Sequence, residues 1–216
     1  MKKLLSGKLT KVVVFLICLL PLARLLCRGF HQDLGANPVE FIQRDLGDWT
    51  LIFLALTLAI SPARKLLKQP QLIRFRRMLG LFAFFYVFLH FTTYIWLDQQ
   101  FDFRGMIKDV AKRPFITAGF TGFVLLIPLA ITSTAGWIRR LGGRRWQMLH
   151  RLIYLTAIAG VIHYYWLVKS DVRKPVAYGL LFAILLGYRV VLWFSARRRT
   201  PGRAPIREEL TTAENA

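Results

Sequence analysis

Long apolar stretches alternate with short, mostly basic segments along the whole chain. A helix needs about 20 mostly apolar residues to cross the hydrocarbon core of a bilayer. Six stretches of roughly that length follow one another. They lie near Leu9–Cys27, Asp48–Leu66, Leu79–Leu97, Phe115–Thr134, Leu149–Val168 and Val176–Phe194. The pattern predicts an all-α, polytopic membrane protein built as a six-helix bundle.

Polar and proline residues mark several ends of these stretches. Asp48 precedes the second apolar run and is expected to cap that helix, and Pro62 lies near its end. Pro114 and Pro175 fall where prolines are tolerated in a first helical turn. Pro128 lies inside the fourth stretch and predicts a kink or close packing there.

The same pattern divides the chain into three parts. Residues 1–8 form a short N-terminal segment, residues 9–195 form the six-helix domain, and residues 196–216 form a polar tail. The tail has too few apolar residues to build a core, so we expect it to be disordered.

Composition and charge support a membrane protein. The 216 residues are 55% hydrophobic, yet the formal net charge is +20. Most of the 31 Lys and Arg residues lie in the N-terminus, the second and fourth loops and the C-terminal part, whereas most of the 11 acidic residues lie in the other loops. Because cytoplasmic loops are enriched in Lys and Arg, both termini are expected in the cytoplasm.

The basic residues do not require nucleic acid as a partner. SPARKLLKQPQLIRFRR and WIRRLGGRRW are juxtamembrane clusters that anionic lipids of the bilayer would attract. A minority of these cations could instead bind a cofactor phosphate or an acidic protein. Cys18 and Cys27 lie nine residues apart, outside any CxxC, CxxCH or zinc-site spacing, which argues against an iron–sulfur cluster and covalently attached haem.

The histidines are the candidate functional residues. His31 lies close to Asp33 in the first outer loop and is expected to be a solvated loop residue. His90 and His163 precede the outer ends of the third and fifth stretches by similar lengths, which puts them within about 3 Å of the same depth. Two neutral imidazoles at one depth suit the two axial positions of a haem iron. Phe85, Phe88 and Phe91 could cover the porphyrin.

His150 is expected to serve a different site. It lies about 20 Å from His163 along the helix axis and on a face turned by about 140°. The residue at matching depth on the third stretch is Arg77, which is no ordinary iron ligand. A second, inner haem at His150 is therefore less well supported than the outer one.

Other functions remain open on these residues alone. His90 and His163 could form a polar pair, a proton relay or the gate of a small-molecule or ion transporter. The third to sixth stretches contain no Asp or Glu, and the chain shows no inverted repeat, which weakens the transporter interpretation. A haem-handling factor would use the same ligands for a transiently bound haem.

Four segments carry a family resemblance over nearly the whole chain. GDWTLIFLALTLAISPAR, RRMLGLFAFFYVFLHFTTY, KRPFITAGFTGFVLLIPLAITST and RRWQMLHRLIYLTAIAGVIHYYWLVKSD resemble the haem-binding membrane subunit of the bacterial protein-methionine-sulfoxide reductase system. That family belongs to the ferric-reductase-like transmembrane group. The histidine-bearing segments are the most specific part of the likeness.

The resemblance implies a membrane electron carrier. It implies b-type haem, one or two per chain, and FMN, with the family's haem ligands matching His90, His150 and His163. It also implies a location in the bacterial inner membrane. Electrons would come from a cytoplasmic flavin reductase or the quinone pool and pass to a periplasmic molybdenum-containing subunit that repairs oxidised envelope proteins. FMN residues are not assigned, since no FMN motif is recognisable.

The absence of a GxGxxG unit indicates that the chain does not oxidise a nicotinamide unaided. A non-catalytic subunit of an oxidoreductase complex is therefore expected. The nearest alternative is a haem-containing transmembrane reductase with another acceptor, such as ferric iron.

Overall fold

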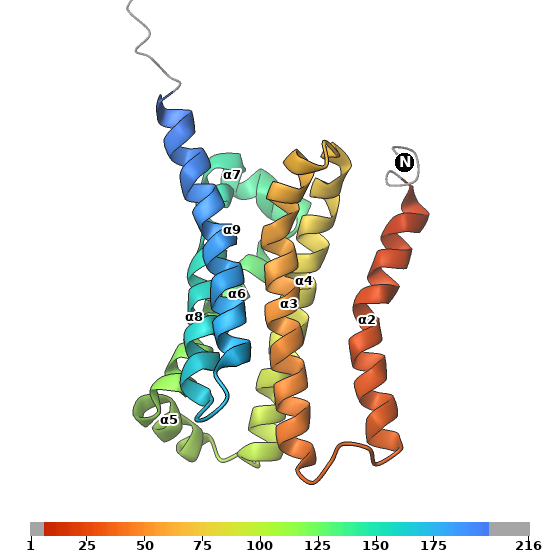
Figure 1. Cartoon of the computed structure of the whole chain (residues 1–216), viewed down its shortest axis with the longest axis vertical. Coiled ribbons are helices and arrows are strands. Elements are labelled where there is room, and N and C mark those ends of the chain that lie inside the picture. The colour runs from red at the N-terminus through yellow and green to blue at the C-terminus, as the bar shows by residue number, and fades with distance from the viewer. Residues whose placement is uncertain (1–6, 199–216) are drawn as a thin grey trace, which may run out of the picture.

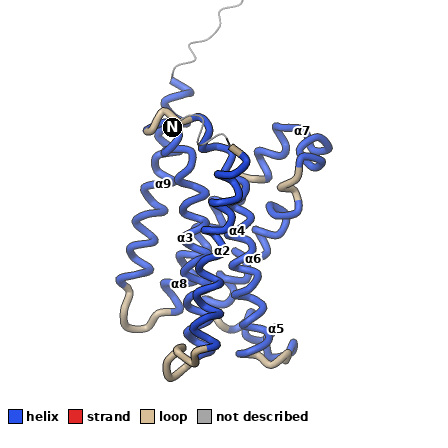
Figure 2. The backbone as a smooth tube through the Cα atoms, turned by 90° about the vertical axis from the view of Figure 1, so that its right-hand side faces the viewer, coloured by secondary structure: helices blue, strands red, loops and turns tan. Residues whose placement is uncertain are grey.

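The computed structural model describes residues 7–198, and every regular element in that range is a helix (Figures 1 and 2). Long helices run side by side in alternating directions (Figure 1). They are α2 (Lys8–Phe30), α3 (Pro38–Leu66), α4 (Ile73–Thr93), α6 (Pro114–Ile131), α8 (Leu152–Leu167) and α9 (Arg173–Arg198). The shorter elements are η1 (Pro70–Leu72), the π-helix η2 (Tyr94–Asp98), α5 (Phe103–Lys112) and α7 (Ala135–Leu149).

The short helices α5 and α7 lie at opposite ends of the bundle (Figures 1 and 2). α5 connects η2 to α6, and α7 connects α6 to α8. The first residue of α2 and the last of α9 both lie at the α7 end (Figure 1). The N-terminal residues 1–6 and residues 199–216, where a disordered tail is expected, lie outside the described part of the chain.

Five helices are long and apolar enough to cross a membrane: α2, α3, α4 with η1 and η2, α6, and α9. The sixth apolar helix, α8, has only 16 residues, but it runs along α6 in the bundle (Figure 1). The predicted all-helical, multi-pass membrane architecture is therefore confirmed.

Two predicted helix starts were too late, and one predicted cap was wrong. α3 begins at Pro38, where the side chain of Asn37 accepts a hydrogen bond from the backbone N–H of Glu40 (3.2 Å). Asp48 lies inside this helix and forms an ion pair with Lys174 (3.2 Å). α4 likewise begins at Ile73 and not near Leu79. The segments left out of the prediction, residues 38–47 and 73–78, carry polar side chains and therefore lack the apolar pattern of a membrane span.

The prolines lie as expected. Pro114 occupies the first turn of α6, and Pro128 lies within that helix. Pro175 is in the first turn of α9, and Pro62 lies inside the last turns of α3.

Tyr86 attaches α2 to the rest of the bundle. Its hydroxyl donates to the backbone carbonyl of Cys18 (2.9 Å) and accepts from the backbone N–H of Leu22 (3.2 Å). These are the two groups that would bond to each other in a regular helix, so the hydroxyl inserts into the α2 ladder directly after Pro21. Tyr86 is fully buried at 0% exposure.

A part-buried arginine joins three helices near the α7 end. Arg189 of α9 donates to the hydroxyl of Tyr154 in α8 (2.8 Å) and to the backbone carbonyl of Leu58 in α3 (2.6 Å). A charged residue at membrane depth needs such partners. These bonds fix α9 against the helices that carry the candidate site.

Candidate functional site

The structure brings together two of the four histidines. His90 lies in the last turns of α4 and His163 in the last turns of α8, and their ring centres are 6.2 Å apart with an angle of 77° between the ring planes. His31 follows α2 as an exposed turn residue, as expected. His150 lies at the end of α7, before α8 begins. The depth matching of the sequence thus identified the pair that meets.

Backbone carbonyls fix the orientation of both rings. Nδ1 of His90 lies 3.0 Å from the carbonyl oxygen of Gln43, and Nδ1 of His163 lies 2.6 Å from that of Phe115. A carbonyl oxygen only accepts, so Nδ1 carries the proton in each ring. The other nitrogen, Nε2, of a neutral ring then has a free lone pair. This is the arrangement that orients histidine as a metal ligand.

The spacing of the pair fits one metal ion between the two rings. Metal–imidazole bonds of about 2 Å put the ring centres of two opposite ligands about 6 Å apart. The 77° angle is compatible, because two ligand planes can rotate about a common metal–nitrogen axis. Within residues 7–198, no cluster of three or more His, Cys, Asp or Glu offers another metal site. The residues present therefore fit the axial positions of a haem iron.

Glycines lie directly against both rings. A Cβ on Gly119 would come within 2.7 Å of Nδ1 of His163, closer than real contacts allow. A Cβ on Gly47 would lie 3.5 Å from Cε1 of His90, an ordinary contact. The close approach of α6 to His163 thus depends on the absence of a side chain at Gly119.

The aromatic residues predicted to cover the site have different surroundings. Phe91 stacks on Phe123 of α6 with ring centres 4.6 Å apart. Phe85 packs edge-on against Tyr86, and Phe88 is half exposed on the outside of the bundle. The ring nearest to His163 after His90 is Phe115, at 6.4 Å between centres. Of the three predicted residues, only Phe91 forms a ring contact with a phenylalanine of α6 among the described residues.

His150 belongs to a separate environment near the α7 end. Its ring stacks on Trp146 with centres 3.9 Å apart, and its Nε2 lies 3.1 Å from the hydroxyl oxygen of Thr132. That hydroxyl donates to the carbonyl of Pro128 (2.6 Å), so Nε2 of His150 must be the donor. In the neutral ring of His150 the proton is therefore on Nε2, whereas in His90 and His163 it is on Nδ1.

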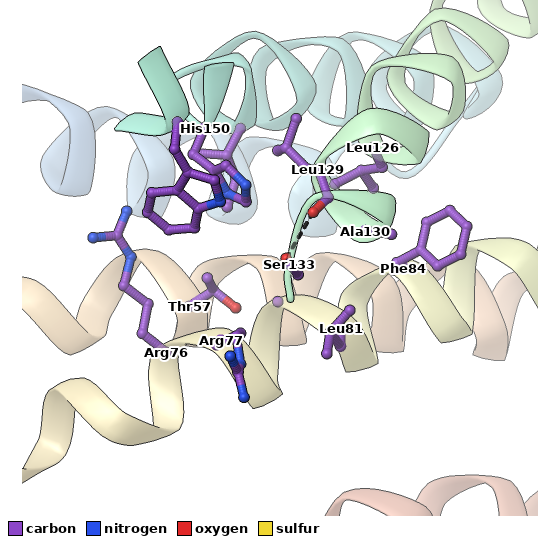
Figure 3. A pocket seen from close by; sticks show the side chains of 13 residues that line it. Thr57, Arg76, Arg77, Leu81, Phe84, Leu126, Leu129, Ala130, Ser133 and His150 are labelled. Atoms are coloured by element: carbon purple, nitrogen blue, oxygen red, sulfur yellow. Dashed lines mark hydrogen bonds between the residues drawn. The ribbon is translucent and has the colours of Figure 1, made fainter. Parts of the chain in front are cut away.

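A cavity of about 110 Å³ opens beside His150 (Figure 3). Arg76 and Arg77 of α4 line it together with His150, and Figure 3 places the three around the same space. Burial, followed by the positive charge of Arg76, lowers the pKa of His150, which favours the neutral ring. The cavity is smaller than typical cofactor pockets of about 300 Å³ or more. It has room for water or a small polar group, and no second imidazole lines it.

Comparison with known proteins places the chain in a family. The model for "Ferric reductase like transmembrane component" matches residues 46–161, a segment that includes His90 and His150. No solved structure matches the fold.

Relatives match over most of their length. A protein of Herminiimonas arsenicoxydans is 57% identical over 84% of this chain and 84% of its own. One from Caulobacter vibrioides is 53% identical over 82% and 85%, and one from Ralstonia nicotianae is 48% identical over 94% and 96%. All three are named "Protein-methionine-sulfoxide reductase heme-binding subunit MsrQ". The chain therefore belongs to the ferric-reductase-like transmembrane family, in the group of haem-binding subunits of protein-methionine-sulfoxide reductase systems.

Proposed function

We propose that this protein is a b-type cytochrome that carries electrons through a membrane to a separate methionine-sulfoxide reductase subunit. The main supporting observation is the His90–His163 pair from α4 and α8. Its ring centres are 6.2 Å apart, and the Nδ1 hydrogen bonds leave Nε2 of each ring free. The names of the relatives support haem as the bound group and a reductase as the partner. FMN remains a prediction without assigned residues.

The residues of the chain hold and orient the cofactor. A haem held by His90 and His163 would supply single-electron transfer. The carbonyls of Gln43 and Phe115 keep both Nδ1 atoms protonated, so that both Nε2 atoms point away as ligands. Both rings are part-buried among apolar helices, and a low-dielectric surrounding would tune the reduction potential of a haem held there.

The topology belongs to the same proposal. We take α8 as a sixth crossing helix, because it packs along α6 and connects at its two ends to opposite sides of the bundle (Figure 1). The α7 end carries most of the basic residues, including Arg139, Arg140, Arg144 and Arg145, and would face the cytoplasm. Both termini would then be cytoplasmic, and the His90–His163 pair would lie in the outer half of the bacterial inner membrane. Residues 9–195 would form one haem domain.

Electrons would enter at the α7 end. The cavity beside His150 combines an imidazole with Arg76 and Arg77, so it offers hydrogen bonds and positive charge to a redox group. A quinone, a cytoplasmic flavin reductase or an inner haem at His150 are the candidates there. A second haem would need a ligand other than histidine and a wider cavity.

Electrons would leave at the α5 end, toward the partner. The acceptor is expected to be a periplasmic molybdenum-containing subunit that reduces methionine sulfoxide in envelope proteins. Docking there would bring the partner close to His90 and His163, which lie in the α4 and α8 turns nearest that end.

The first test is the optical difference spectrum of the purified protein, reduced minus oxidised, with haem quantified as the pyridine complex. We expect a b-type spectrum with near-stoichiometric haem. His90→Ala and His163→Ala should each abolish this signal, while His150→Ala should spare it. His31→Ala, at an exposed turn, is the matched control.

Three outcomes would contradict parts of the proposal. Absence of haem after expression with haem supplied would favour the polar-pair or transporter interpretation of the histidines. Equal loss in all three variants would contradict the separation of His150 from the pair. Reoxidation of the reduced protein by ferric citrate, but not by the reductase partner with methionine sulfoxide, would indicate the alternative acceptor.

A further inference from the structure

α5 has an apolar face and a basic face, and both are exposed. Phe103 and Ile107 lie four residues apart on one side and are 57% and 69% exposed. The three cations Arg104, Lys108 and Lys112 repeat at the same spacing on another side. None of the three forms an ion pair within residues 7–198. A helix divided in this way at the end of a membrane bundle suits the headgroup layer of a leaflet.

An apolar groove of about 420 Å³ runs from the end of α5 along the outside of α6 and α8. Ala111 and Pro114 form its α5 end, and Thr121 and Ala159 lie farther along. Since seven helical residues span about 10 Å, the groove extends roughly that far into the leaflet. It is lined by Ala111, Pro114, Thr117, Ala118, Thr121, Ala159, Ile162 and Trp166.

The dimensions of the groove suit a hydrocarbon chain. The small side chains that line the groove let an acyl chain approach the helix backbones closely. Trp166, which is 54% exposed, forms the wall at the same end as α5, where interfacial tryptophans lie.

Positive charge borders the groove where α5 meets α6. Lys112 and Arg113 lie in sequence between the lining residues Ala111 and Pro114. Nε of Arg113 pairs with Asp109 (3.2 Å), while the Lys112 ammonium has no carboxylate partner among the described residues. An acyl chain in the groove would therefore end in a headgroup beside the unpaired Lys112. A neutral ligand would gain nothing from these cations, and an inorganic anion would gain nothing from the groove.

We propose that the α6–α8 groove and the basic face of α5 form a binding site for one anionic glycerophospholipid. The acyl chain lies against Ala118 and Ala159, and Lys108 and Lys112 bind the phosphate region. The site occupies the leaflet on the α5 side, whichever compartment that side faces. The proposal does not depend on which group the histidines bind or on which partner accepts the electrons.

The groove and the histidine pair share two helices. Ala118 and Ile162 line the groove, and their sequence neighbours Gly119 and His163 form the contact on the inner side. A bound lipid would support the α6–α8 packing that holds the Phe115 carbonyl against His163. Lipid removal is therefore expected to lower the thermal stability of the protein.

The test is photolabelling of the purified full-length protein with a phosphatidylglycerol that carries a diazirine in its acyl chain, followed by peptide mapping. We expect label in residues 111–121 and 159–166, displaced by phosphatidylglycerol at lower concentration than by phosphatidylcholine. Lys108→Gln with Lys112→Gln should reduce that preference by at least about tenfold, since each basic residue contributes roughly a fivefold change at an anionic lipid surface. The matched charge control is Lys65→Gln with Lys68→Gln, two exposed lysines in the last turn of α3 and just after it, at the other end of the bundle.

Ala118→Phe tests the groove itself and should reduce labelling of these peptides several-fold. Ala183→Phe, an equal change on the exposed side of α9, should not. Circular dichroism checks that each variant is folded. Uniform labelling of all exposed helices, or equal displacement by phosphatidylcholine, would overturn the proposal. Displacement by inorganic phosphate alone would indicate a simple anion site, and stronger displacement by a quinone would indicate a different occupant; either result would also overturn it.

Discussion

Gly119 is the residue on which the position of His163 depends most directly. A methyl group there would lie 2.7 Å from Nδ1 and 2.9 Å from Cε1 of the ring. Nδ1 is also the atom that donates to the carbonyl of Phe115, so Gly119→Ala has to disturb that bond. Overpacking of this kind costs about 1–3 kcal/mol. We expect the purified variant to bind less haem, measured by absorbance, and to unfold at lower temperature.

Gly187→Ala is the control for the general effect of alanine in a helix. Nothing lies within 4 Å of a Cβ at Gly187, so this change should leave haem content unchanged. Its stability should stay equal or rise by up to about 1 kcal/mol. Equal haem content in both variants would show that Gly119 does not position His163.

The histidine pair could be predicted from sequence, but its hydrogen-bond partners could not. Similar distances from two helix ends are enough to match the depths of His90 and His163. The acceptors are main-chain carbonyls of Gln43 and Phe115, which any residue type provides. Only the packing of α3 and α6 determines which carbonyls reach the rings, and the sequence contains no local sign of it.

At the scale of elements, Asp109 links η2, which follows the helix of His90, to the start of α6, whose Phe115 carbonyl orients His163. Its carboxylate accepts from Tyr94 (3.5 Å) and Gln99 (3.2 Å), which follow His90, and pairs with Arg113, which precedes Phe115. Asp109→Asn removes the charge from a carboxylate that is only 18% exposed. Weakening such part-buried bonds costs roughly 1–3 kcal/mol. We therefore expect a lower unfolding temperature and faster loss of haem on heating.

The comparison for Asp109 is Asp171→Asn. Asp171 pairs with Arg173 at 3.9 Å on an exposed surface, and such pairs contribute about 0–1 kcal/mol. The Asp171→Asn variant should therefore unfold and lose haem at the same temperatures as the wild-type protein. If the two variants had the same unfolding temperature and the same rate of haem loss, Asp109 would not stabilise the packing of α4 and α6.

Tyr86 holds a whole helix through one hydroxyl. Tyr86→Phe keeps the ring but leaves the Leu22 N–H without its acceptor and the Cys18 carbonyl without its donor. An unsatisfied buried group costs about 1–3 kcal/mol. We expect faster hydrogen exchange at the Leu22 amide and a looser α2, with haem content retained, since neither histidine lies in α2. Tyr188→Phe, which removes a hydroxyl without a hydrogen-bond partner among the described residues, should leave exchange at Leu22 unchanged.

The prediction missed the helices α5 and α7, because it relied on the length of apolar stretches. The membrane-crossing helices are long and apolar, so their cores were predictable. α5 is an amphipathic helix of only ten residues. α7 bends at Gly142, where φ is +73°. Neither helix contains a continuous apolar stretch long enough to cross a membrane. Both lie at the ends of the bundle, where water and lipid headgroups permit polar faces.

At the scale of the whole molecule, charge predicts the orientation of the bundle. The α7 end carries the basic clusters and the α5 end a mixture of both signs, so positive-inside sorting should put α7 in the cytoplasm. In a Cys27→Ser background, which removes the exposed thiol and leaves buried Cys18, Ser170→Cys marks the α5 end and Gly143→Cys marks α7. A membrane-impermeant maleimide should label Ser170→Cys in cells with a permeabilised outer membrane, and Gly143→Cys only after the inner membrane is opened. Because the His90–His163 pair lies near the α5 end, this labelling also decides which compartment the bound haem is closest to. The reverse pattern would place the electron exit on the cytoplasmic side and would be incompatible with a periplasmic acceptor.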